Sequence, residues 1–68
     1  MWEVHDYILI DFIEAGAVIK INTDIVFVRE IEHNPDGIIV RGLDDTWNEN
    51  GEWTIDPDTI VPVMIEQD

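Results

Sequence analysis

The chain has 68 residues and carries sixteen Asp and Glu against three Lys and Arg, which gives a formal net charge of −13. Its length allows one small domain over residues 1–68 with a thin core, because so short a chain buries only about 60% of its unfolded surface. The hydrophobic content of 46% is normal for a globular domain, so we expect the chain to fold despite its charge.

The charge argues against direct binding to nucleic acids or membranes. Lys20, Arg29 and Arg41 are scattered and cannot form an electrostatic footprint on phosphates. An anionic bilayer would repel the chain, and no stretch approaches the eighteen or so apolar residues of a spanning segment. Residues 1–6 lack the basic start of a secretory signal, so we expect a cytoplasmic protein, in the host cytoplasm if it is phage-encoded.

The residue inventory argues against catalysis. The chain has no Cys and no Ser, which removes disulfides, thiolate metal sites and the commonest hydroxyl nucleophile. His5 and His33 therefore have no conventional nucleophile to activate and no zinc-binding spacing around them. We expect no enzyme activity, no catalytic residues and no cofactor.

The first segment is ambiguous between a strand and a helix. Apolar side chains alternate through residues 2–13, but Val4, Ile8 and Phe12 also fit a helical spacing of four. The β-branched and aromatic content favours a strand over about 7–13, and a helix remains the alternative.

The rest of the chain has the pattern of short strands separated by turns. Turns are expected where Gly, Pro, Asn and Asp cluster, at 14–16, 22–24 and 34–37. The expected strands are 7–13, 17–21, 25–32, 38–41, 52–55 and 60–65, and residues 43–51 are expected to form a polar loop.

Three details refine the expected strands. The strand 25–32 is apolar on both faces at first and charged later, which indicates a bend or bulge. Gly42 should end the strand before it, and Pro62 should lie at a sheet edge or meet one, because it cannot donate to a ladder. Residues 56–59 should form a helical turn, with Asp56 as its cap.

This order of elements predicts an all-β fold of five to six short antiparallel strands. From residues 14–19 to residues 55–63, the strand-and-turn rhythm resembles SH3-like barrels, and in detail the small acidic barrels of bacteriophages. The resemblance implies a small closed barrel with one 3₁₀ turn just before the last strand. It transfers no functional residues, because a shared fold does not imply a shared function.

The loop 43–52 is rich in oxygen ligands and offers a weak alternative as a calcium site. Thr46, Asn48, Asn50 and Gly51 fit part of an EF-hand register, but Pro57 stands where the bidentate Glu should be. A solvated loop is therefore the better interpretation, and we expect no metal.

The charge pattern carries the functional expectation. Glu30 and Glu32 should point to the same side of a strand, about 6.6 Å apart, which is close to two phosphate steps along one DNA strand. We therefore expect an acidic protein that mimics DNA, binds a positively charged surface and inhibits a nucleic-acid-handling or host defence enzyme. The expected contacts are Glu30, Glu32, Asp44, Asp45, Glu49, Glu52, Asp56 and Asp58, with Trp47 as an apolar anchor.

Three alternatives compete with this hypothesis. The chain could be a structural or adaptor component of a virion or assembly, acting through strand edges and apolar surface, with self-association as one form. Its charge could instead keep a small protein soluble and blunt its strand edges, or reflect a halophilic origin.

Overall fold

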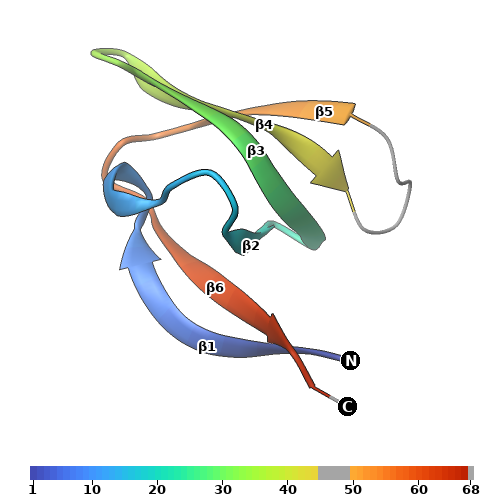
Figure 1. Cartoon of the computed structure of the whole chain (residues 1–68). Helices are drawn as coiled ribbons and strands as arrows, with labels where there is room; N and C mark the ends of the chain where they lie inside the picture. The colour runs from blue at the N-terminus through green and yellow to red at the C-terminus, as the bar shows by residue number, and fades with distance from the viewer. Residues whose placement is uncertain (45–49, 68) are drawn as a thin grey trace.

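The computed structural model describes residues 1–44 and 50–67, which form six strands and one short 3₁₀ helix. The fold is mainly β, as the sequence predicts, and all strand pairs are antiparallel. The strands join into one sheet in the order β1-β6-β2-β3-β4-β5 (Figure 1). In chain order the elements are β1 (Trp2–Leu9), η1 (Ile10–Phe12), β2 (Val18–Ile21), β3 (Asp24–Asn34), β4 (Gly37–Asp44), β5 (Asn50–Ile55) and β6 (Ile60–Glu66).

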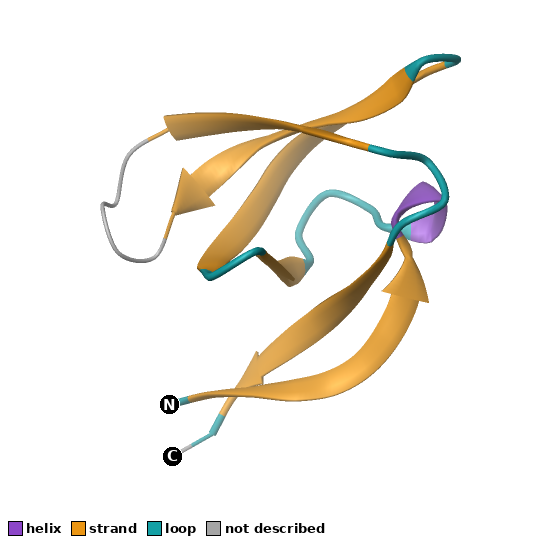
Figure 2. Cartoon of the chain, turned by 180° about the vertical axis from the view of Figure 1, so that it is seen from behind, coloured by secondary structure: helices purple, strands orange, loops and turns teal. Residues whose placement is uncertain are grey.

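The sheet is strongly bent but open. Strands β3, β4 and β5 form one side, β1 and β6 form the other, and β2 lies between them (Figures 1 and 2). Strands β1 and β5 are the two edges, and no pairing joins them within residues 1–44 and 50–67. The closed barrel expected from the sequence is therefore not confirmed.

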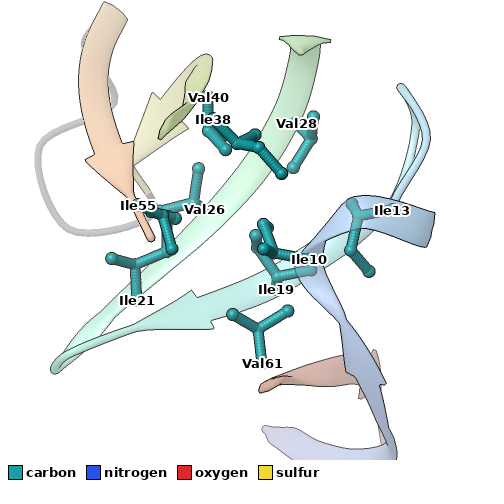
Figure 3. Packing of buried hydrophobic residues seen from close by; sticks show 10 residues of the cluster. All are labelled: Ile10, Ile13, Ile19, Ile21, Val26, Val28, Ile38, Val40, Ile55 and Val61. Carbon is teal, nitrogen blue, oxygen red and sulfur yellow. The ribbon is translucent and has the colours of Figure 1, made fainter. Parts of the chain in front are cut away.

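The core lies between the two sides of the bent sheet (Figure 3). It consists almost entirely of β-branched side chains, which suit a pleated and half-buried surface. Every strand except β1 contributes a buried residue to it, and Trp53 packs against it from β5. The buried members are Ile10, Ile13, Ile19, Ile21, Val26, Val28, Ile38, Val40, Ile55 and Val61.

The ambiguous first segment is a strand that begins earlier and ends earlier than predicted. β1 covers Trp2–Leu9, and the chain then turns through η1 instead of continuing as a strand to residue 13. A register shift between Val4 and Asp6 breaks the alternation, so the apolar residues of 2–13 do not share one face. Phe12 is consequently 72% exposed, whereas Ile10 is fully buried.

The bulge predicted in the third strand is confirmed. The register of β3 against β4 shifts between Val28 and Glu30, which leaves Arg29 as the extra residue. The insertion lets both Val28 and Ile31 face the core although they are three apart. It also directs Glu30 to the outer face of the sheet.

The prediction that Gly42 ends a strand is wrong, because β4 continues through it to Asp44. A Cβ atom at Gly42 would lie 1.9 Å from the carbonyl oxygen of Phe27, just before the bulge. Glycine is required at this position for the close approach of β3.

The prediction of a 3₁₀ turn just before the last strand is wrong, because the 3₁₀ helix lies elsewhere. Residues 57–58 form a single turn in which Thr59 N–H donates to the Asp56 carbonyl and Asp58 N–H donates to Asp56 Oδ1 at 2.9 Å. The chain enters β6 directly after this turn, so the expected 3₁₀ helix does not form. The 3₁₀ helix is η1, and it is attached to the same turn because Ile10 N–H donates to the Thr59 carbonyl at 2.8 Å.

Strand β6 is internal in the sheet, and its proline pairs with a residue of the edge strand β1. Pro62 pairs with Tyr7 of β1, whereas the pairing with β2 is confined to Ile19 and Val63. Two further hydrogen bonds extend the β1–β6 ladder, from Met1 N to the Gln67 carbonyl and from Gln67 N to the Met1 carbonyl.

Candidate functional site

Three of the predicted contact residues meet on the outer face of β3, β4 and β5, around one arginine. Arg41 Nε donates to Glu52 Oε2 at 3.0 Å. Its Nη1 lies 3.7 Å from Glu30 Oε1 and 3.6 Å from Glu32 Oε1. We call Glu30, Glu32, Arg41 and Glu52 the Arg41 cluster.

Strand register explains why these residues meet. Arg41 lies in the middle strand, directly opposite Glu30 on β3 and Glu52 on β5. Glu32 is two residues further along β3 and therefore points to the same side, as the sequence predicts. Opposite side chains on one face of an antiparallel sheet lie within contact distance.

The cluster is ordered by its own contacts and remains exposed. The side chains of Glu30, Glu32 and Glu52 are 67%, 48% and 59% exposed, so a partner could reach all three. The hydrogen bond to Glu52 and the neighbouring carboxylates raise the pKa of Arg41 above its ordinary value. The hydrogen bond from Asn34 and the charge of Arg41 lower the pKa of Glu32 below its ordinary value of 4.5.

An open groove of about 580 Å³ adjoins the cluster. Arg29, the bulged residue, lines it and donates a hydrogen bond to Asn50 Oδ1 at 3.3 Å. Glu30, Arg41 and Glu52 line it too. The groove therefore presents both charges. Its carboxylates contact Arg41, whereas Arg29 bonds to the neutral amide of Asn50 within residues 1–44 and 50–67.

The other predicted contacts are distributed elsewhere. Asp44, at the end of β4, is only 6% exposed and does not belong to the exposed cluster. Asp56 and Asp58 lie in the turn before β6, where Asp56 accepts the hydrogen bonds that shape the turn. Asp45, Trp47 and Glu49 lie outside the described residues, as does most of the loop considered for calcium.

Most exposed carboxylates in the described ranges have no cation beside them. Outside the Arg41 cluster, the contact of this kind within residues 1–44 and 50–67 is the hydrogen bond between Asp11 Oδ1 and His33 Nδ1 at 3.2 Å, between η1 and the end of β3. Exposed carboxylates without such a pair are those of Glu3, Asp6, Glu14, Asp36, Asp56, Asp58 and Glu66.

Sequence reasoning missed the role of Arg41. The signal was available, because the two-residue turn at Pro35 and Asp36 fixes the register of its hairpin. Counting outward from that turn places Arg41 opposite Glu30.

Sequence reasoning also missed an apolar outer face on β1 and β6. Residues paired across these strands place Val4, Tyr7 and Ile60 on the outer side, and they are 44%, 65% and 62% exposed. Pro62 shares this face, because it lies two residues after Ile60 along β6, whereas Met64 on the same side is buried.

Among the described residues, no three His, Cys, Asp or Glu side chains are placed so that they could hold a metal ion, and no helix is long and apolar enough to cross a membrane. Comparison with protein-family models, curated proteins and solved structures finds no match to this chain.

Proposed function

We propose that this chain binds a basic site on another protein and blocks a nucleic-acid-handling or defence enzyme by presenting a DNA-like charge. One observation carries the proposal: a domain with a net charge of −13 groups Glu30, Glu32 and Glu52 around Arg41 on one exposed face. Carboxylates that are already grouped need less rearrangement on binding. The remaining negative charge would steer a cationic partner toward the chain.

Arg41 is compatible with this role. It neutralises one of the three charges and removes the repulsion that would otherwise separate them. The cluster still carries two net negative charges, and the described part of the chain offers it no other cation within ion-pair distance.

We infer that the strands adopt an SH3-like arrangement and that the chain is a phage-type protein. The strand order supports the scaffold, because it brings the first and last strands together and places β3, β4 and β5 across the core from them (Figure 1). The acidity of so small a β domain supports the class.

The proposal is tested by capturing partners from a host lysate at low salt and at about 0.5 M salt, where surface charges are screened beyond a few ångströms. We expect a basic nucleic-acid-binding protein that releases at high salt and whose binding to DNA the chain inhibits. The triple variant E30Q/E32Q/E52Q should lose this inhibition. The control E3Q/E14Q/E66Q makes the same charge change away from the cluster and should retain most of it.

A second candidate function is a structural or adaptor role. It is favoured by the apolar outer face of β1 and β6, where Val4, Tyr7 and Ile60 are exposed. Self-association that persists at high salt and is lost in Tyr7→Ser would support this role. Salt-resistant association together with intact inhibition in E30Q/E32Q/E52Q would reject charge mimicry.

A further inference from the structure

The two edges of the sheet differ in how they are protected. On β1 the register shift at His5 interrupts the edge, and Tyr7 N–H donates to Asp6 Oδ1 at 2.8 Å. Bulges and local hydrogen bonds of this kind blunt an edge against strand addition. On β5 the six pairs with β4 run without a shift, and its sequence contains no proline.

Hairpin geometry identifies which peptide groups β5 leaves free. The two-residue turn makes Asn34 and Gly37 the closing hydrogen-bonded pair of β3 and β4. Alternation along β4 then directs the peptide groups of Ile38, Val40 and Gly42 toward β5.

Their partners on β5 are Ile55, Trp53 and Gly51. The N–H and C=O groups of Glu52 and Thr54 consequently point away from β4. Within residues 1–44 and 50–67, no backbone hydrogen bond outside the β4 ladder reaches β5. This edge therefore carries donors and acceptors that an added strand could pair with.

We propose that the free edge of β5 accepts an extended segment of the basic partner as an additional antiparallel strand. This inference rests on the proposed function and names the partner's binding mode. In such a complex, main-chain hydrogen bonds supply affinity and the alternating side chains supply specificity.

The surroundings of β5 define the sequence pattern of that segment. Side chains beside Glu52 and Thr54 would lie on the outer face, next to the carboxylates of the Arg41 cluster, and should be basic. Side chains beside Trp53 and Ile55 would lie on the inner face and should be apolar. A groove of about 530 Å³ at this end of β5, lined in part by the core residues Ile21 and Ile55, offers room for one of them.

Charge argues against a second copy of this chain as the occupant. Two copies joined through β5 would bring Glu52 and its neighbouring carboxylates together, and each copy carries −13. A segment of alternating basic and apolar residues meets the opposite charge instead.

The test uses three capped decapeptides of alternating Lys and Val with the full chain. One is unmodified, one is methylated at the backbone nitrogens of its lysines, and one is methylated at the backbone nitrogens of its valines. In the antiparallel register, the residues opposite Glu52 and Thr54 supply the hydrogen bonds, and these are the lysines. Methylation at Lys should weaken binding roughly tenfold or more, whereas methylation at Val should change it little.

Hydrogen exchange and edge variants provide the second measurement. The amides of Glu52 and Thr54 should exchange more slowly when the unmodified peptide binds. Thr54→Lys should weaken binding by repelling the peptide, and the matched variant Thr54→Gln should not.

The outcomes separate the two proposals. Equal binding of all three peptides would overturn strand addition and leave charge attraction standing. No binding of any peptide at low salt would overturn both. If the chain self-associates and the amides of Glu52 and Thr54 exchange slowly without peptide, the edge is occupied by a second copy of the chain. That result would overturn the proposal of a basic segment.

Discussion

The outer faces of the two sides of the sheet differ in what they present to solvent. The face of β3, β4 and β5 carries three carboxylates around Arg41. The face of β1 and β6 carries Val4, Tyr7 and Ile60 instead. The difference shows that net charge alone does not describe this surface, because one side groups three carboxylates around a cation while the other side exposes apolar side chains.

The largest expected effect comes from removing the close approach that permits the bulge in β3. Gly42→Ala places a Cβ 1.9 Å from the Phe27 carbonyl oxygen, so the two strands must separate. We expect a loss of about 3 kcal/mol in the free energy of unfolding, measured by urea denaturation.

Gly37→Ala is the matched control, because its Cβ would lie 3.4 Å from the nearest side-chain atom, at Thr54. Equal stability of the two variants would show that the bulge does not depend on Gly42.

Salt should produce the next largest effect. The molecule measures 38 × 25 × 19 Å, so at 0.01 M salt, where the screening length is about 30 Å, nearly all its charges repel one another. Raising the salt to about 0.2 M should raise the Tm by several degrees, measured by circular dichroism. Tetramethylammonium chloride should act like sodium chloride, and a response to sodium alone would indicate ion binding instead of screening.

Removing the guanidinium from the Arg41 cluster should have a moderate effect. Arg41→Gln leaves three carboxylates without their shared cation, so the Tm should fall by a few degrees, and by more at low salt. The control is Arg29→Gln, which removes the same charge from a residue that bonds only to Asn50 in the described ranges. Identical thermal shifts would mean that the chain responds to total charge and not to the cluster.

The smallest effect should appear in acid. The pKa of Glu32 is lowered in the folded chain, so its contribution to stability is present above the unfolded value of 4.5 and is lost as the pH falls through the folded value. Glu32→Gln should therefore reduce stability at pH 7 and flatten its pH dependence below pH 4.5, as measured by urea unfolding at each pH. Glu14→Gln, on the loop before β2, is the control. If it flattens the pH dependence of stability equally, the effect does not depend on the contact between Glu32 and Arg41.

Local sequence patterns predicted much of the fold. The turn residues at 34–37 and the β-branched runs after Ala17 have a single consistent interpretation, and the strands form there. The charged half of 25–32 correctly indicated the bulge at Arg29.

The failures have physical causes that lie outside any local window. Gly42 continues a strand because a carbonyl from β3 occupies the space of its Cβ, a contact set by the fold and not by its neighbours in sequence. The first segment changes direction at Ile10 because that residue donates to Thr59, almost fifty residues later. Similarly, the link between Arg41 and Glu52 depends on the register of β5 against β4, which the polar sequence between the two strands does not specify.

The paired ends of the chain have a mechanical consequence. Met1 and Gln67 hydrogen-bond to each other, and β1 and β6 run antiparallel away from that point (Figure 2). A force applied between these two residues would load the ladder one pair at a time, starting at Trp2 and Glu66, instead of shearing all its hydrogen bonds together. Under tension this chain should therefore unzip from its termini at low force, and the β3–β4 hairpin should be among the last parts to open.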